Sequence, residues 1–168
     1  AYYGYDGGIM ITASHNPPEY NGMKMVRSES RPISGDTGLL NIEKRAFEQK
    51  WERTGSGTRE DKNVYSDFVQ HLLKIVDPST LKPLKIVADP GNGAAGIALD
   101  ELLPHVPFEL EKVRWEPNGE FPHGVPNPIL PEARALTEQA LAKGGFDFGV
   151  AWDGDYDRCF FFDEHGNF

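Results

Sequence analysis

The order of apolar and polar positions predicts strands and helices that alternate along the chain. Segments of strand length, rich in apolar residues, occupy residues 9–13, 23–26, 84–88, 108–113, 146–152 and 159–162. Apolar residues recur at helical spacing over residues 37–51, 62–76, 94–103 and 131–143. The apolar run just before Thr12 is unbroken by polar residues, which predicts a buried strand there.

Local signals set the ends of the helices and divide the chain. The helix over 62–76 has its apolar residues spaced for one buried face, and Asp77-Pro78 ends it. Pro131 opens the last helix at its first turn, where proline is tolerated, and Gly144-Gly145 stops it. The first helix carries the apolar residues Leu39, Leu40, Ile42, Phe47 and Trp51.

The polar stretch TGSGT at residues 54–58 has the composition of a linker. We therefore expect two units, one over residues 1–60 and one over residues 61–168 that includes the connecting helix. Strands that alternate with helices favour parallel pairing. The predicted fold class is α/β, with mixed, mostly parallel sheets sandwiched by helices. Residues 115–131 are dense in Pro, Gly and Asn, and this segment is longer than a simple connection requires.

Composition narrows the range of functions. The chain has 168 residues and a formal net charge of −9, and it contains no Lys/Arg-rich run, which argues against nucleic-acid binding. Its single cysteine, Cys159, rules out an internal disulfide and fits a reducing compartment. With neither a membrane-length apolar stretch nor a visible signal peptide, we expect a cytoplasmic protein that does not bind membranes. Because it begins at Ala1 and stops just after a hairpin-like segment, we also expect it to be part of a longer protein.

The segment TASHNPP at residues 12–18 combines a serine, an imidazole and a turn. It follows a predicted strand, and Asn16-Pro17 breaks the regular structure, which presents the Ser14 hydroxyl beside His15. Lys24 lies ten residues further along. A serine that carries a covalent group needs such a fixed yet exposed position, with a base or cation in reach. An ordinary turn with a surface Ser-His pair would have the same sequence.

The segment DGDYDR at residues 153–158 places three carboxylates at alternate positions between two predicted strands. Asp153, Asp155 and Asp157 converge only if the backbone curls, and a divalent cation would relieve their mutual repulsion. All-oxygen ligands favour Mg²⁺, Ca²⁺ or Mn²⁺ over Zn²⁺. An EF-hand is excluded because Arg158 stands where its loop requires glycine and because both flanks read as strands. The alternative is a solvated acidic turn.

The glycines at residues 91–96, GNGAAG, match the dinucleotide-binding pattern GxGxxG after a strand. Asp89-Pro90 separates the strand from the first glycine, however, and a carboxylate there would face the pyrophosphate. Glu111 is the nearest acidic residue to the position expected for ribose binding. The other interpretation is a glycine-rich turn that lets a helix and a strand pack closely, and we favour it.

Four segments together resemble the α-D-phosphohexomutases in order and spacing. They are TASHNP at 12–17, NGMK at 21–24, DPGNGAAG at 89–96 and DGDYDR at 153–158. Within that family, residues 27–38, 121–128 and 158–160 are most similar to bacterial phosphomannomutases of the GDP-mannose pathway. Asp89-Pro90 and Tyr156 depart mildly from the commonest form, and neither change removes a ligand. The resemblance spans nearly the whole chain.

The resemblance implies a reversible transfer of phosphate between O6 and O1 of a hexose phosphate. Ser14 would be phosphorylated in the resting enzyme, and a glucose or mannose 1,6-bisphosphate would serve as intermediate and activator. Asp153, Asp155 and Asp157 would hold one Mg²⁺ per active site, together with an oxygen of phosphorylated Ser14. The expected reaction interconverts mannose 6-phosphate and mannose 1-phosphate. Phosphoglucomutase or dual activity is the nearest alternative.

The remaining site residues have two interpretations each. Lys24 and His15 are candidates for general acid/base catalysis, because a sugar hydroxyl loses a proton and Ser14 gains one. His15 could instead orient the Ser14 turn, and Lys24 could be a surface lysine. Arg158 either adds a cation to the metal loop or phosphate, or pairs with one of the aspartates.

The family resemblance also implies partners for this chain. Family members have four domains around one cleft, and this sequence corresponds to the later part of domain 1 and most of domain 2. Domains 3 and 4, which hold the sugar-specificity and distal phosphate residues, would be its partners, with a hexose phosphate as substrate. We expect little or no mutase turnover from these residues alone. A nucleotide-binding module and a non-catalytic metal-binding domain are the alternatives from other functional classes.

Overall fold

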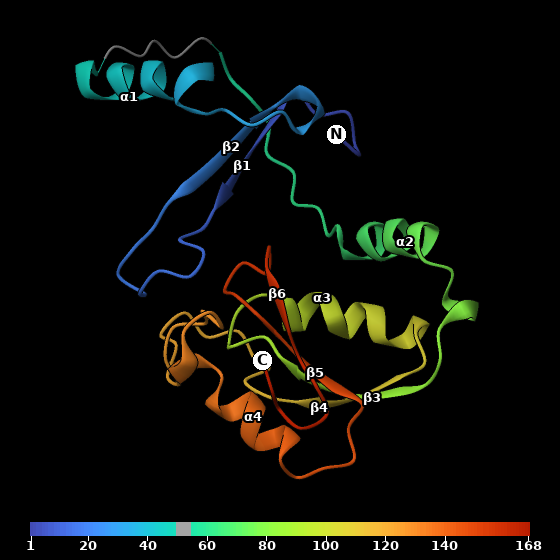
Figure 1. Cartoon of the computed structure of the whole chain (residues 1–168). Coiled ribbons are helices and arrows are strands. Elements are labelled where there is room, and N and C mark those ends of the chain that lie inside the picture. The colour runs from blue at the N-terminus through green and yellow to red at the C-terminus, as the bar shows by residue number, and fades with distance from the viewer. Residues whose placement is uncertain (50–54) are drawn as a thin grey trace. The chain divides into compact units, whose positions relative to one another are not determined.

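A computed structural model describes residues 1–49 and 55–168 (Figure 1). The chain divides into two compact units. The first comprises residues 1–12 and 21–62, and the second comprises residues 13–20 and 63–168. The turn that carries Ser14 therefore groups with the second unit, although the strand before it belongs to the first.

In its described residues, 1–12, 21–49 and 55–62, the first unit contains a two-stranded antiparallel sheet and one α-helix. Strand β1 (Gly7–Ile11) pairs with β2 (Met23–Arg27), with Ile9 opposite Met25. Helix α1 (Leu39–Glu48) follows a short 3-10 turn, Gly35–Thr37, in which the Ser34 and Thr37 side chains form a capping box. Trp51, assigned to this helix from the sequence, lies outside the described residues.

The expectation that β1 is buried is wrong. Ile9 and Ile11 are 63% and 64% exposed, and every residue of the strand is exposed. An unbroken apolar run is typical of a strand covered on both faces of a large sheet. Here β1 pairs with β2 alone, in a sheet of two strands.

The second unit contains a mixed four-stranded sheet in the order β4-β3-β5-β6 (Figure 1). Its strands are β3 (Leu84–Asp89), β4 (Phe108–Lys112), β5 (Phe148–Trp152) and β6 (Cys159–Phe162). Strand β3 runs parallel to both β4 and β5, and only β6 is antiparallel to its neighbour. The predicted mixed, mostly parallel α/β fold is therefore confirmed.

Alternation along the strands gives this sheet two apolar faces. One face carries Val87, Ala151 and Phe162, which pack with Ala140 and Leu141 of α4 (Ala135–Leu141). The opposite face carries Ile86, Ala88 and Val150. Helix α3 (Ala95–Leu102) lies over this second face, where Leu99 and Leu102 line an apolar pocket with the strand residues. The sheet is thus covered from both sides by helices.

Two helices differ from their predicted form. Residues 131–143 form a 3-10 turn, Pro131–Ala133, followed by the shorter helix α4, which ends before the left-handed glycines 144 and 145. Helix α2 (Tyr65–Ile75) buries only Val69 fully instead of a whole face. Within its unit α2 packs mainly against α3, so a narrow stripe of apolar residues is enough for that contact.

No helix in the described part of the chain is long and apolar enough to cross a membrane.

Candidate active site

The candidate site lies where the carboxyl ends of β3 and β5 meet. Strand β4 lies beside β3 on one side, and β5 lies beside β3 on the other. The direction in which strands are added to the sheet therefore reverses between β3 and β5. Open α/β sheets bind ligands at the carboxyl ends of strands beside such a reversal. Both the glycine-rich turn after β3 and the acidic loop after β5 lie at this edge.

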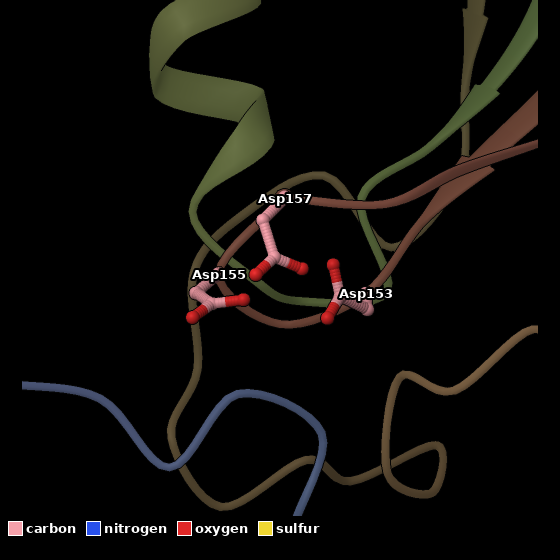
Figure 2. A group of neighbouring side chains, drawn as sticks. All are labelled: Asp153, Asp155 and Asp157. Carbon is pink, nitrogen blue, oxygen red and sulfur yellow. The ribbon is translucent and has the colours of Figure 1, made fainter. Parts of the chain in front are cut away.

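Three carboxylates converge in the loop between β5 and β6. Asp153, Asp155 and Asp157 each offer an oxygen, and these oxygens all lie within 4.8 Å of one another. Figure 2 shows the three side chains turned toward one shared space. The backbone curls because Tyr156 takes a left-handed conformation, with φ of 48°, and its amide donates to the carbonyl of Asp153. The predicted convergence of the three aspartates therefore occurs.

The Ser14 hydroxyl lies against this cluster. Its Oγ is 3.1 Å from Asp153 Oδ2 and 3.2 Å from Asp155 Oδ1, and its single proton can be donated to one of them at a time. Ser14 itself has a φ of 56°, a conformation that non-glycine residues rarely adopt and that is common at functional sites. Asn16 closes the turn by donating its backbone and side-chain N–H groups to the carbonyl of Ala13.

Arg158 is the cation at the centre of the cluster. Its Nη2 donates to Ser14 Oγ at 3.0 Å and also contacts Asp153, while its Nε donates to Asp157 at 3.2 Å. Partial burial by itself lowers the pKa of Arg158, but the contacts with Asp153 and Asp157 outweigh it and raise the pKa above its ordinary value. Arg158 thus contacts both the aspartates and Ser14, so the two roles left open by the sequence are compatible.

His15 and Lys24 occupy different places. The Nδ1 atom of His15 lies 3.2 Å from Ser14 Oγ and also contacts Nη2 of Arg158. An arginine can only donate, so Nδ1 is the acceptor in this contact. That arrangement favours an orienting role for His15. Lys24 lies on β2 in the other unit, opposite Met10, and its proposed role remains a prediction from sequence.

The sequence did not reveal a buried ion pair directly behind the site. Asp89, fully buried at the end of β3, accepts from Arg114 Nε at 2.9 Å and from Thr137 Oγ1 at 2.6 Å. The Arg114 side chain is only 4% exposed. A carboxylate that ends an apolar strand is itself a signal, because a buried charge requires a partner. Arg114 follows the neighbouring parallel strand, so the topology brings it to the same edge.

The acidic loop has the donor set of a hard divalent cation. Its three carboxylates face one guanidinium, so the cluster keeps a negative formal charge, and its converging side-chain ligands are all oxygens. Burial raises the pKa of the Tyr156 phenol within the same loop, and nearby Tyr65 adds to the shift, so this side chain stays neutral near pH 7. These residues fit a hard divalent cation such as Mg²⁺, Ca²⁺ or Mn²⁺.

Comparison with protein families covers nearly the whole chain. Residues 63–166 match the sequence model described as phosphoglucomutase/phosphomannomutase, alpha/beta/alpha domain II. Residues 1–53 match the corresponding model for alpha/beta/alpha domain I.

Individual proteins show the same similarity. A protein named phosphohexose mutases from Xanthomonas campestris pv. campestris is 54% identical over 167 residues, covering 96% of this chain and 36% of that protein. A phosphomannomutase from Escherichia coli K12 is 47% identical, covering 99% and 38%. The crystal structure of a phosphoglucomutase/phosphomannomutase family protein from Burkholderia thailandensis superimposes with a TM-score of 0.86 at 34% identity, covering 96% of this chain and 34% of that one. The chain thus spans little more than a third of the length of these relatives.

Proposed function

Because this chain belongs to the phosphoglucomutase/phosphomannomutase family, we propose that the protein containing it interconverts the 1- and 6-phosphates of a hexose. Mannose phosphate is the proposed principal substrate, on the strength of relatives named phosphomannomutase at 47% identity. Glucose phosphate is the alternative. The observation that carries the proposal is the position of Ser14 Oγ between two aspartates of the acidic cluster and an arginine.

Ser14 is the proposed phosphate carrier. In the first half of the reaction the bond between phosphorus and Ser14 Oγ breaks while a sugar hydroxyl oxygen bonds to that phosphorus. The hydroxyl proton passes to a base, and the departing Ser14 Oγ takes up a proton from an acid, so that Ser14 becomes a neutral hydroxyl. The resulting hexose 1,6-bisphosphate reorients in the site and returns its other phosphoryl group to Ser14. A phosphorylated serine is nearly a dianion at neutral pH, so the approach of another oxygen requires positive charge nearby. The Arg158 guanidinium, 3.0 Å from Oγ, supplies part of it.

Asp153, Asp155 and Asp157 are the proposed ligands of one Mg²⁺. When bound, the ion would act as a Lewis acid that neutralises phosphate charge. His15, with Nδ1 accepting from Arg158, is proposed to orient that guanidinium and the Ser14 turn. Lys24 is the proposed acid/base group or phosphate contact, carried from the family resemblance.

The test is a turnover measurement on the complete protein that contains this sequence. Mannose 1-phosphate and glucose 1-phosphate are supplied separately with Mg²⁺ and a catalytic amount of hexose 1,6-bisphosphate, and ³¹P NMR follows the products. We expect conversion to the 6-phosphates, with the higher kcat/KM for mannose. A higher value for glucose would reassign the substrate, and conversion of neither sugar phosphate would refute the proposal.

The proposed metal site has its own test. Replacing Asp155 with asparagine keeps the shape of the side chain but removes one anionic ligand. We expect the affinity for Mn²⁺, used as a paramagnetic probe, to fall by at least about tenfold. Glu164→Gln is the matched control, because Glu164 is an exposed carboxylate in the next turn. Equal Mn²⁺ affinity of the two variants, read by electron paramagnetic resonance, would remove Asp155 from the ligand set.

A further inference from the structure

The glycine-rich turn after β3 does not offer the free amides that a pyrophosphate needs. The N–H groups of residues 91–94 all donate to protein oxygens instead. Their acceptors are Asp89 Oδ1 at 2.9 Å, the Arg114 carbonyl at 2.7 Å, the Pro90 carbonyl at 2.9 Å and the Gly154 carbonyl at 3.1 Å. The dinucleotide-binding interpretation of this motif is therefore not supported, and the motif needs another role.

The last of these bonds joins the turn to the acidic loop. Ala94 N–H donates to the carbonyl of Gly154, the residue between Asp153 and Asp155. The two backbones are so close that a Cβ on Gly93 would lie 2.6 Å from the Gly154 carbonyl oxygen and 2.9 Å from its Cα. A Cβ on Gly154 would lie 2.3 Å from the carbonyl oxygen of Ser14. Three backbones thus stack without side chains between them: the turn, the acidic loop and the Ser14 turn.

The turn is itself held from behind. Asp89 Oδ1, which accepts from the Gly91 amide, also accepts from Arg114 Nε. Asp89 Oδ2 accepts from Thr137 Oγ1 at 2.6 Å, and Arg114 donates further to the Ala133 carbonyl at 2.9 Å. These partners come from β3, the segment just after β4, the 3-10 turn Pro131–Ala133 and α4, so hydrogen bonds connect the turn to the sheet and to the helical segment. A buried hydrogen-bond network whose groups are all paired restricts the motion of the groups that it joins.

We infer that the turn at residues 90–94 is a backbone support that sets the distance between the aspartates and Ser14. Gly93 is a positioning residue, and Thr137 acts through Asp89 on the same turn. The support depends on the proposed function, because it acts on the proposed phosphoryl-transfer site. Partners behind a metal's ligands commonly change its affinity by about 10- to 100-fold when removed. Gly93 does not touch the carboxylates, so its effect passes through the Gly154 backbone.

The test compares Gly93→Ala with Gly119→Ala in the complete protein. A Cβ at Gly119 meets nothing within 4 Å, so this variant is the matched control. We expect Gly93→Ala to lower Mn²⁺ affinity and kcat by about tenfold each. KM for the hexose phosphate should stay within about twofold, because the turn acts on the aspartates and Ser14. Gly119→Ala should match the unmodified protein in all three. A folded Gly93→Ala protein with unchanged Mn²⁺ affinity and kcat would overturn the support.

A second pair of variants, at Thr137, tests the support if the Gly93→Ala protein does not fold. Thr137→Val removes the hydroxyl that donates to Asp89 but keeps the volume, whereas Thr137→Ser keeps the hydroxyl. If the turn is a support, Thr137→Val should bind Mn²⁺ more weakly than the unmodified protein, and Thr137→Ser should bind it about as well. Equal Mn²⁺ affinities of the two variants would contradict the support. Measurements on the unmodified protein distinguish a failure of the proposed function from a failure of the proposed support. If it neither binds Mn²⁺ nor converts a hexose phosphate, the proposed function fails and the support with it; if it does both, only the support is at stake.

Discussion

Replacing Ser14 with alanine in the complete protein is expected to lower kcat for hexose phosphate by at least about 10³-fold, equivalent to about 4 kcal/mol of activation free energy. The phosphoryl group has no other attachment point in the proposed mechanism, because Oγ is the atom held between Asp153, Asp155 and Arg158. The three aspartates remain, so Mn²⁺ affinity should change far less than kcat. The measurement is steady-state turnover alongside Mn²⁺ titration.

Backbone strain is the main confounding effect in this experiment. Ser14 has a φ of 56°, and alanine is strained there much as serine is. Ser14→Gly removes the same hydroxyl while easing that strain, so both variants should lose activity to a similar extent. Ser66→Ala, an exposed position on α2 in the same unit, is the control and should keep full activity. Turnover above a tenth of normal in both Ser14 variants would be incompatible with a phosphate carrier at this residue.

Local sequence was sufficient for the acidic cluster. Alternating aspartates between two apolar runs leave few arrangements other than a curled loop at a strand end, and the structure has that loop. Their proximity to Ser14 could not come from local pattern, because 139 residues separate Ser14 from Asp153. That relation depends on the packing of the Ser14 turn against Gly154 of the acidic loop, and only the family resemblance indicated it.

Burial was the least predictable property. Hydropathy shows that β1 is apolar but does not say what covers it, and in a two-stranded sheet the strand is exposed. The Asp89–Arg114 pair was not predicted either, because Arg114 belongs to none of the motifs and Asp89 was considered only for its effect on a bound nucleotide. Asp89 looked only like a carboxylate that argues against a nucleotide. Its partner becomes visible once β3 and β4 are known to end at one edge.

Replacing Asp89 with asparagine should produce the largest loss of stability among single substitutions in the second unit that keep side-chain size. The change removes the anion that pairs with Arg114, whose side chain is only 4% exposed. Uncompensated buried charges of this kind cost about 3–5 kcal/mol of unfolding free energy. The measurement is urea unfolding followed by tryptophan fluorescence. Glu111→Gln is the control, because its ion pair with Lys143 is exposed and should contribute at most about 1 kcal/mol.

A double variant separates stability from positioning. Asp89→Leu combined with Arg114→Met removes both charges, and apolar replacement of a whole buried pair is often neutral or stabilising. We therefore expect most of the lost unfolding free energy to return. The Gly91 amide would still lack its acceptor, Asp89 Oδ1, so Mn²⁺ affinity should stay below that of the unmodified protein. If stability and Mn²⁺ affinity recovered together, the buried pair would serve the fold alone, because its removal would leave the acidic loop correctly placed.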